Sequence, residues 1–294
     1  MMDNRAEVRD FLRTRRAKIT PQSVGLPTDG QRRVPGLRRS EVATLAGVSI
    51  EYYSKLERGY LAGVSASVLE AIARALRLDM AEREHLFDLA QTADNGASLM
   101  RRRRRSESAW TPRPSLQWVL DGMRDAPAIV TNGRSDLLLT NDLARAMYAD
   151  VLVSPKPNFA RFTFLDDAAH RFYPDWEFFA DTTVATLRTE AGRSPHDQSL
   201  HELVGELSTL SPEFRTRWSA HDVRIHTTGL KHFHHEVVGD LVLTYETVPL
   251  ISEPGLTMTV YAAEPGSPSA QNLRLLASWS AVQNTESGAD LQRS

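Results

Sequence analysis

The sequence predicts two domains, an all-α domain of five helices followed by an α+β domain with an antiparallel sheet. Three observations lead to this prediction. Residues 1–93 carry apolar side chains at helical spacing, residues 94–114 are rich in Ser, Arg and Pro, and the remainder mixes strand-like and helical segments. A chain of 294 residues is long enough to form two cores. We therefore expect an N-terminal domain at 1–93, a linker at 94–114, a second domain at 115–267 and a C-terminal tail at 268–294.

The first domain should contain a helix over residues 7–18, two short helices on either side of Gly47, and two further helices. Ser49 is a good N-cap for the helix after Gly47, and Ser65 or Ser67 for the next one. The expected inner-face residues of the two short helices are Val42, Leu45, Ala46, Tyr53 and Leu56.

The second domain should open with a hairpin, because apolar runs at 127–132 and 137–141 flank a polar turn. Asn141 is expected to cap a following helix. Further helices are predicted at 171–191, 199–207 and 212–218, and strands at 222–238, 239–250 and 255–265. Helices should cover one side of this sheet, and the polar chain after Pro265 should fray.

Composition excludes several classes of protein. The chain has no cysteine, so disulfides, thiolate metal sites and cysteine nucleophiles are excluded. It shows no apolar run long enough to cross a membrane and no signal peptide, which favours a cytoplasmic protein. No nucleophile elbow, phosphate-binding loop or dinucleotide glycine pattern occurs, so we do not expect an enzyme.

The charge is distributed unevenly along the chain. Residues 1–110 contain 20 basic and 14 acidic side chains, whereas residues 111–294 contain 15 and 23. A basic first part suggests that this part meets a polyanion such as DNA.

The segment SEVATLAGVSIEYYSKLERG has the pattern of a helix-turn-helix unit. Small Ala43 allows the two helices to cross, and Gly47 allows the positive φ of the turn. The exposed start of the second helix would then enter the major groove of DNA. The residues expected to contact bases are Ile50, Glu51, Tyr52 and Lys55.

Several residues near this unit are expected to contact DNA phosphates. They are Arg32, Arg33, Arg38, Arg39, Ser49 and Arg58. The run Arg101–Arg105 would either add phosphate contacts or form a solvated part of the linker.

Residues 1–92 resemble the Xre-type helix-turn-helix of phage-repressor-like regulators, through the spacing A-x-x-A-G-V-S…L-E-R-G. The resemblance implies a five-helix repressor fold that binds a palindromic operator as a homodimer. Dimerisation also has a physical motive, because one short helix reads too few base pairs for useful specificity. The basic insertion RRVPGLRR before the motif departs from the family pattern.

Residues 112–267 resemble the PAS-like ligand-binding domain of MmyB-like regulators. The segments that carry the resemblance include PAIVTNGRSDLLLTND, FLDDAAHRFYPDWE and HHEVVGDLVLTYETVPL. The resemblance implies a transcription factor whose second domain holds a fatty acid or another small apolar ligand. Glu236 stands where the family usually has proline.

An apolar ligand needs an apolar tunnel and a few polar groups at its mouth. The candidate ligand-binding residues are Asn141, Tyr148, Trp176, Phe179, Phe214, Arg215, Trp218 and His221. Each of these also fits a plain core or capping role.

Two alternative functions of the second domain stay open: it could only dimerise the chain, or it could be a metal sensor built from His221, His226, His232, His234 and His235. Metal sensing is the weaker alternative, and we expect no metal site.

Overall fold

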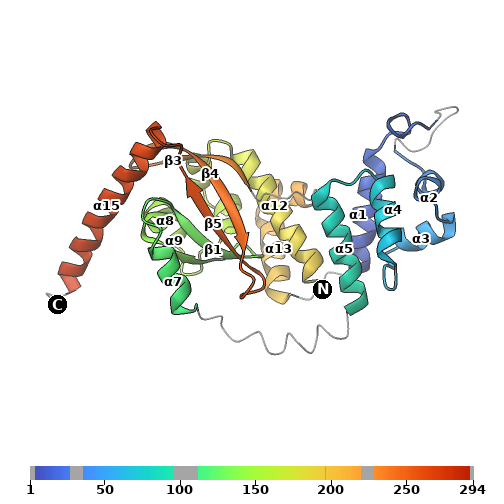
Figure 1. Cartoon of the computed structure of the whole chain (residues 1–294), viewed down its shortest axis with the longest axis horizontal. Coiled ribbons are helices and arrows are strands. Elements are labelled where there is room, and N and C mark those ends of the chain that lie inside the picture. The colour runs from blue at the N-terminus through green and yellow to red at the C-terminus, as the bar shows by residue number, and fades with distance from the viewer. Residues whose placement is uncertain (1–3, 27–35, 96–111, 196, 220–227, 292–294) are drawn as a thin grey trace. The chain divides into compact units, whose positions relative to one another are not determined.

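The computed structural model describes residues 4–26, 36–95, 112–195, 197–219 and 228–291 (Figure 1). The chain divides into two compact units. The first consists of the described residues within Met1–Ala109, Arg188–Ser208 and Arg215–Ile225, and the second of those within Trp110–Leu187, Thr209–Phe214 and His226–Ser294. The predicted linker lies largely outside the described residues, as does Arg101–Arg105.

The first unit contains the five predicted N-terminal helices. They are α1 (Asn4–Lys18), α2 (Arg39–Ala46), α3 (Ile50–Glu57), α4 (Ala66–Ala75) and α5 (Met80–Asn95), with a short 3-10 turn at Gln22–Val24. Their apolar faces meet in one core that includes Phe11, Leu12, Tyr53 and Leu56. The helical N-terminal domain is thereby confirmed.

The predicted helix caps in this unit are observed. Ser49 accepts a hydrogen bond from the Tyr52 backbone N–H, and Ser65 accepts one from Val68. Leu45 differs from expectation, because 38% of it is exposed. In the short helix α2 the buried face is formed by Val42, Ala43 and Ala46 instead.

The first unit also includes the end of α12 (Trp176–Arg193), most of α13 (Gln198–Leu210) and the end of α14 (Pro212–Ser219). Arg188 of α12 is fully buried here and forms an ion pair of 2.6 Å with Glu7. Its guanidinium donates to the Trp218 carbonyl and lies 4.0 Å from the centroid of the Trp218 ring. The Thr92 hydroxyl donates to the Gly192 carbonyl over 3.0 Å. Parts of three helices beyond the predicted linker therefore pack within this unit.

The second unit is built on a five-stranded antiparallel sheet in the order β2-β1-β5-β4-β3. Its strands are β1 (Ala128–Asn132), β2 (Leu137–Thr140), β3 (Thr228–His235), β4 (Gly239–Pro249) and β5 (Leu256–Ala262). The α+β class with an antiparallel sheet is confirmed. Its remaining helices are α7 (Pro114–Asp121), α8 (Asp142–Met147), α9 (Ala149–Leu152), α10 (Phe159–Leu165), α11 (Ala168–Phe172) and α15 (Pro268–Leu291).

Both faces of the sheet carry helices, which differs from the expected one-sided cover. Successive side chains of β1 point to opposite faces. Ile129 belongs to the large core shared with α8, α11 and α12, whereas Ala128 and Val130 pack with Leu120 of α7. The helix α7 was not predicted, because its short apolar pattern follows directly on the polar linker.

The C-terminal segment also differs from expectation. Instead of fraying, Pro268–Leu291 form α15, whose last turns extend beyond the sheet (Figure 1). Leu273 and Leu276 are buried in the main core of the second unit. Ser269 accepts a hydrogen bond from the Val242 backbone N–H over 2.8 Å and so ties α15 to β4.

Candidate functional site

The turn between α2 and α3 has the geometry that the sequence predicts. Gly47 has a φ of +66°, a left-handed conformation that glycine adopts without steric cost. The Val48 backbone N–H returns to the Ala43 carbonyl over 3.0 Å, which closes the end of α2. Ser49 then caps α3, whose first residues lie at the surface of the unit.

The start of α3 presents most of the residues expected to read bases. Ile50 is 48% exposed, and Glu51 and Lys55 are exposed beside it on the same helix. Tyr52 is half-buried and packs against the core, while Tyr53 is fully buried as expected. One apolar, one acidic and one basic side chain therefore face outward from the first turns of α3.

A buried ion-pair network holds α3 against its neighbours. Glu57 is 1% exposed and receives two hydrogen bonds from Arg16, of 2.8 and 3.0 Å, and one of 2.9 Å from Arg39. Burial would raise the pKa of the Glu57 carboxyl, but the hydrogen bonds and charges of Arg16 and Arg39 outweigh it and lower that pKa. The network fixes the angle at which α3 is presented.

The residues expected to contact phosphates differ in their exposure and in their partners. Arg38 and Arg58 are exposed, and the Arg58 guanidinium donates to the Ser54 carbonyl over 3.1 Å. Arg39 is exposed over half of its side chain but is bound to Glu57. Arg32 and Arg33 lie outside the described residues.

The second unit contains a cavity of about 130 Å³ between the sheet and its helices. Its aromatic walls come from Tyr148, Phe159, Tyr173, Phe179 and Tyr261. Hydroxyl and amide groups complete the lining, from Thr131, Asn132, Ser135, Thr163, Thr182, Thr183, Thr186 and Thr259. Ile129 and Lys231 also line the cavity.

Lys231 of β3 is the cationic group of this cavity. Its Nζ lies 4.2 Å from the centroid of the Tyr245 ring, 5.5 Å from that of Phe179 and 5.6 Å from that of Tyr261. Burial among these rings lowers the pKa of the Lys231 amine from 10.5 to about 8.

Three tyrosines of the cavity are buried. Burial raises the pKa of Tyr148 and Tyr173 well above 10, and it raises that of Tyr261 as well. The Tyr148 and Tyr261 side chains hydrogen-bond each other. These phenols stay protonated at neutral pH, and because one proton is used in the bond between Tyr148 and Tyr261, two of the three O–H groups can donate to a ligand.

The predicted ligand-binding residues of the second unit fall into two groups. Tyr148 and Phe179 line the cavity. Trp176 is buried in the core and donates to the Thr163 carbonyl over 2.9 Å, and Phe214 packs edge-on against Phe164.

Asn141 is committed to local structure. Its side-chain oxygen accepts from the backbone N–H groups of Ala144 and Ala128, and its amide donates to the carbonyls of Met123 and Ala126. It caps α8, as predicted, and borders a second hollow of about 410 Å³ beside α15.

The other predicted ligand residues lie elsewhere. Arg215 and Trp218 belong to the first unit, where Arg215 donates to the Ser208 carbonyl and Trp218 underlies Arg188. His221 lies outside the described residues.

Lys231 was missed from the sequence, although a signal was present. In the strand GLKHFHHE, residues 231, 233 and 235 share one face, and Phe233 and His235 are typical inward residues. A lysine at an inward position of such a strand is unusual, because charged side chains are rarely buried without a partner. The histidines of this strand are the residues for which the sequence suggests a metal-binding alternative.

Those histidines have other partners in the structure. His234 lies 2.6 Å from Asp240 and His232 lies 3.1 Å from Asp175, while His235 meets the Ala146 carbonyl at 3.2 Å. Among the described residues, no three histidine or carboxylate side chains converge as metal ligands. His221 and His226 lie outside those residues.

Comparison with protein families gives two matches. Residues 7–86 match the model of a helix-turn-helix domain, and residues 112–276 match that of the MmyB-like transcription regulator ligand binding domain. Comparison with curated proteins found no significant match. Within the described part of the chain, no helix combines the length and the apolar character that a membrane span requires. The second match covers more than half of the 294 residues, so the chain belongs to the family of MmyB-like transcription regulators and combines a DNA-binding helix-turn-helix domain with a ligand-binding domain.

Proposed function

We propose that this regulator is a cytoplasmic homodimer that reads a palindromic operator with α3 and is controlled by a small molecule bound in the second unit. The observation that carries the DNA-reading part is the exposure of Ile50, Glu51 and Lys55 at the start of a capped helix after a glycine turn. Ile50 would meet a thymine methyl group, and Glu51 a cytosine amino group. Lys55 is a further base-contacting candidate. Arg38 and Arg58, with Arg39, Ser49, Arg32 and Arg33, would contact phosphates.

The finer family assignments belong to the same proposal. The helical domain is Xre-type, on the strength of its motif spacing. The second domain is PAS-like, since a strand pair, a series of helices and three further antiparallel strands follow one another along the chain. Neither matched family is an enzyme family, and we propose no catalytic role.

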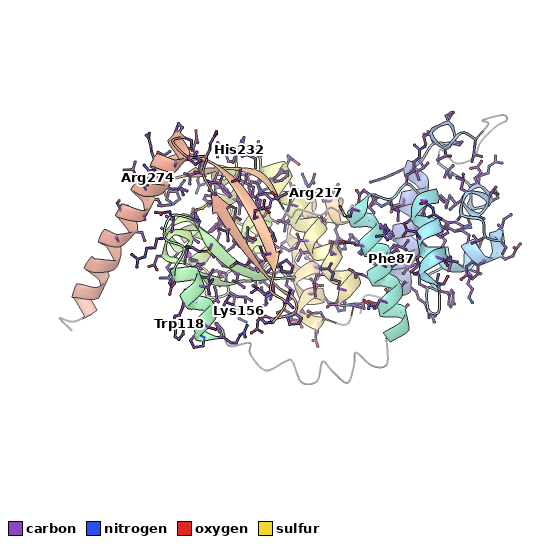
Figure 2. All side chains as sticks on the ribbon, viewed as in Figure 1. Phe87, Trp118, Lys156, Arg217, His232 and Arg274 are labelled. Carbon is purple, nitrogen blue, oxygen red and sulfur yellow. The ribbon has the colours of Figure 1, made fainter. Side chains whose placement is uncertain are left out.

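Dimerisation is supported by exposed apolar side chains on the second unit. Leu230, Val242 and Val248 are exposed on the same face of the sheet, and that face also carries α7. Trp118 of α7 is 71% exposed (Figure 2). The exposed Thr244 and Glu246 lie between Val242 and Val248 on β4, so these apolar side chains are separate on the surface. A second copy of the chain that covered them would also supply the second recognition helix that a palindrome requires.

Ligand control is supported by the cavity behind Tyr148 and Phe179. Its aromatic walls suit an apolar body, and its lysine and hydroxyl groups suit a polar head. A fatty acid is one such ligand, and smaller molecules of the same design are others. Ligand binding would control transcription only if the ligand favoured one DNA-binding state of the dimer over another.

The test is DNA binding by the full chain, measured by fluorescence anisotropy and footprinting on the upstream region of its own gene at several salt concentrations. We expect a protected palindromic site, and Glu51→Ala should change the preferred base at one position of each half-site. Glu84→Ala, an exposed acidic residue of α5, is the matched control and should leave the preference unchanged. Equal affinity for every sequence would contradict the proposal, and a monomeric mass of the DNA-bound species would contradict dimerisation.

A further inference from the structure

Lys231 places a cation in an aromatic cavity. The residue as a whole is half-buried, and its Nζ lies 4.2 to 5.6 Å from the ring centroids of Tyr245, Phe179 and Tyr261. Such contacts with ring faces stabilise a cation only in part. Burial of the amine is the cause of its lowered pKa, so the surroundings do not replace the water that the charge has lost.

No carboxylate offsets this charge in the described part of the chain. Two neighbours of Lys231 on β3 have carboxylate partners: His232 pairs with Asp175, and His234 pairs with Asp240. Among the described residues, no ion pair involves Lys231. A buried charge without a counter-ion is costly, and natural proteins pair such charges or neutralise them. The site is therefore electrostatically incomplete, and an anion would complete it.

The rest of the lining supplies donors around the same space. The phenols of Tyr148, Tyr173 and Tyr261 are protonated, and the hydroxyls of Thr131 and Thr259 lie on the strands beside them. Hydroxyl groups donate strong, short hydrogen bonds to a carboxylate. The aromatic rings leave the remaining volume apolar.

The size of the cavity limits the body of the ligand. A dry protein cavity of about 150 Å³ accepts benzene. The cavity of about 130 Å³ is close to this size and is partly open to solvent. Its enclosed part therefore has room for about one ring or an equally short branched chain, and most of a long acyl chain would lie outside it.

We propose that this cavity binds a compact organic monocarboxylate, with the carboxylate on the Lys231 ammonium and a single ring or short apolar body between Tyr148, Tyr173 and Phe179. The inference rests on the proposed function in that the second unit binds a regulatory small molecule. It narrows the ligand class from fatty acids in general to small, singly charged carboxylic acids.

The experiment is calorimetric titration of the full-length protein with benzoate, phenylacetate, cyclohexanecarboxylate and hexanoate. Benzamide serves as the uncharged analogue of benzoate, and tetradecanoate as the long-chain comparison. We expect at least one compact carboxylate to bind, benzamide to bind at least about tenfold more weakly than benzoate, and tetradecanoate to bind more weakly than the compact acids.

Two lysine variants complete the test. Lys231→Met should weaken carboxylate binding at least about tenfold, while Lys156→Met, which changes an exposed lysine of the same unit (Figure 2), should leave it unchanged. At pH 8 to 9 binding should also take up protons, because a bound anion favours the charged amine; titrations in buffers of different ionisation heat measure this. The proton uptake needs no variant, so the test stands even if Lys231→Met folds poorly.

Three results would overturn the inference: equal affinity for benzamide and benzoate, unchanged carboxylate affinity in a folded Lys231→Met variant, or no binding of any compact carboxylate. Operator binding by the same preparation, measured without ligand, separates this failure from failure of the regulator proposal. Specific DNA binding without carboxylate binding would refute only the ligand class. Carboxylate binding without specific DNA binding would refute only the DNA-reading proposal.

Discussion

At the scale of single residues, Lys231 should make the free energy of unfolding depend on pH in a particular direction. Its amine has a pKa of about 8 in the folded chain and about 10.5 unfolded, so between these values the unfolded chain holds more protons and stability rises with pH. Below about pH 8 the folded protein carries the full cost of the buried charge. Lys231→Met should therefore stabilise the ligand-free protein at pH 7, by an amount on the order of 1–3 kcal/mol at most.

Urea unfolding of both proteins from pH 6 to 11 measures this effect. The difference in the free energy of unfolding between Lys231→Met and the parent protein should shrink as the pH rises from 8 to 10.5. Lys156→Met, whose side chain is exposed, should follow the parent throughout. A difference that stays constant over this range would show that the amine is not the cause.

Asn141 should act in stability and not in ligand binding. All four of its hydrogen bonds go to backbone groups of its own neighbourhood. Asn141→Ala removes the cap of α8 and leaves the buried Ala128 N–H without its side-chain acceptor. Together these losses should lower the free energy of unfolding by about 2–4 kcal/mol. Thermal unfolding measures the loss, and titration with benzoate at a temperature where the variant is folded should show the parent affinity. A large drop in affinity would instead place Asn141 at the ligand.

Local backbone requirements of single residues can be predicted from this sequence, whereas long-range side-chain partners cannot. Gly47 and Ser49 occupy the turn and cap positions expected of them, because φ preference and capping depend on immediate neighbours. The partners of Glu57 and Lys231 come from other elements, so no local pattern indicates them.

At the scale of elements, strong periodicity predicted the helices α1 to α5 and the strands β1, β2, β4 and β5 to within a few residues. The helices that the sequence did not predict have a common feature. The segments of α7, α10 and α15 are short or mixed in composition, and their helical form is stabilised by what they pack against. Tertiary packing of this kind cannot be seen in a local window.

The helix α15 offers a test with two adjacent leucines. Leu276 is fully buried in the main core, whereas Leu275 is 61% exposed. Leu276→Ala should lower the free energy of unfolding by about 2–5 kcal/mol, because it leaves a cavity between α15 and the sheet. Leu275→Ala should change it by less than about 0.5 kcal/mol. Chemical denaturation of both variants checks this, and equal effects would mean that α15 does not pack in solution as described.

At the scale of the whole molecule, composition predicted two domains but not which residues belong to each compact unit. The chain divides inside α12, at Leu187 and Arg188, where a continuous helical pattern carries no boundary signal. A segment rich in Ser, Arg and Pro predicts a domain boundary along the chain, but it does not predict that a later segment packs with residues that precede the boundary.

Residues 188–208 and 215–225 should therefore contribute to the stability of the helical unit that contains α1 to α5. A fragment that ends at Ala109 lacks Arg188, which is fully buried against Glu7 and Trp218 in the full chain. We expect its amide hydrogens in α1 and α5 to exchange faster than those of the full-length protein, because the cover of these helices is removed.

A point substitution separates this effect from truncation. Arg188→Ala in the full chain should destabilise the helical unit by about 3–5 kcal/mol, since it removes the 2.6 Å ion pair of the partly buried Glu7 and leaves only His85, at 3.9 Å. Arg193→Ala removes a 53% exposed arginine that pairs with Asp88, and should cost less than about 1 kcal/mol. Hydrogen exchange followed by mass spectrometry locates the change: faster exchange in α1 and α5 for Arg188→Ala alone supports the described packing. Parent-like exchange in both the fragment and Arg188→Ala would mean that α1 to α5 form a self-sufficient domain, as composition alone suggests.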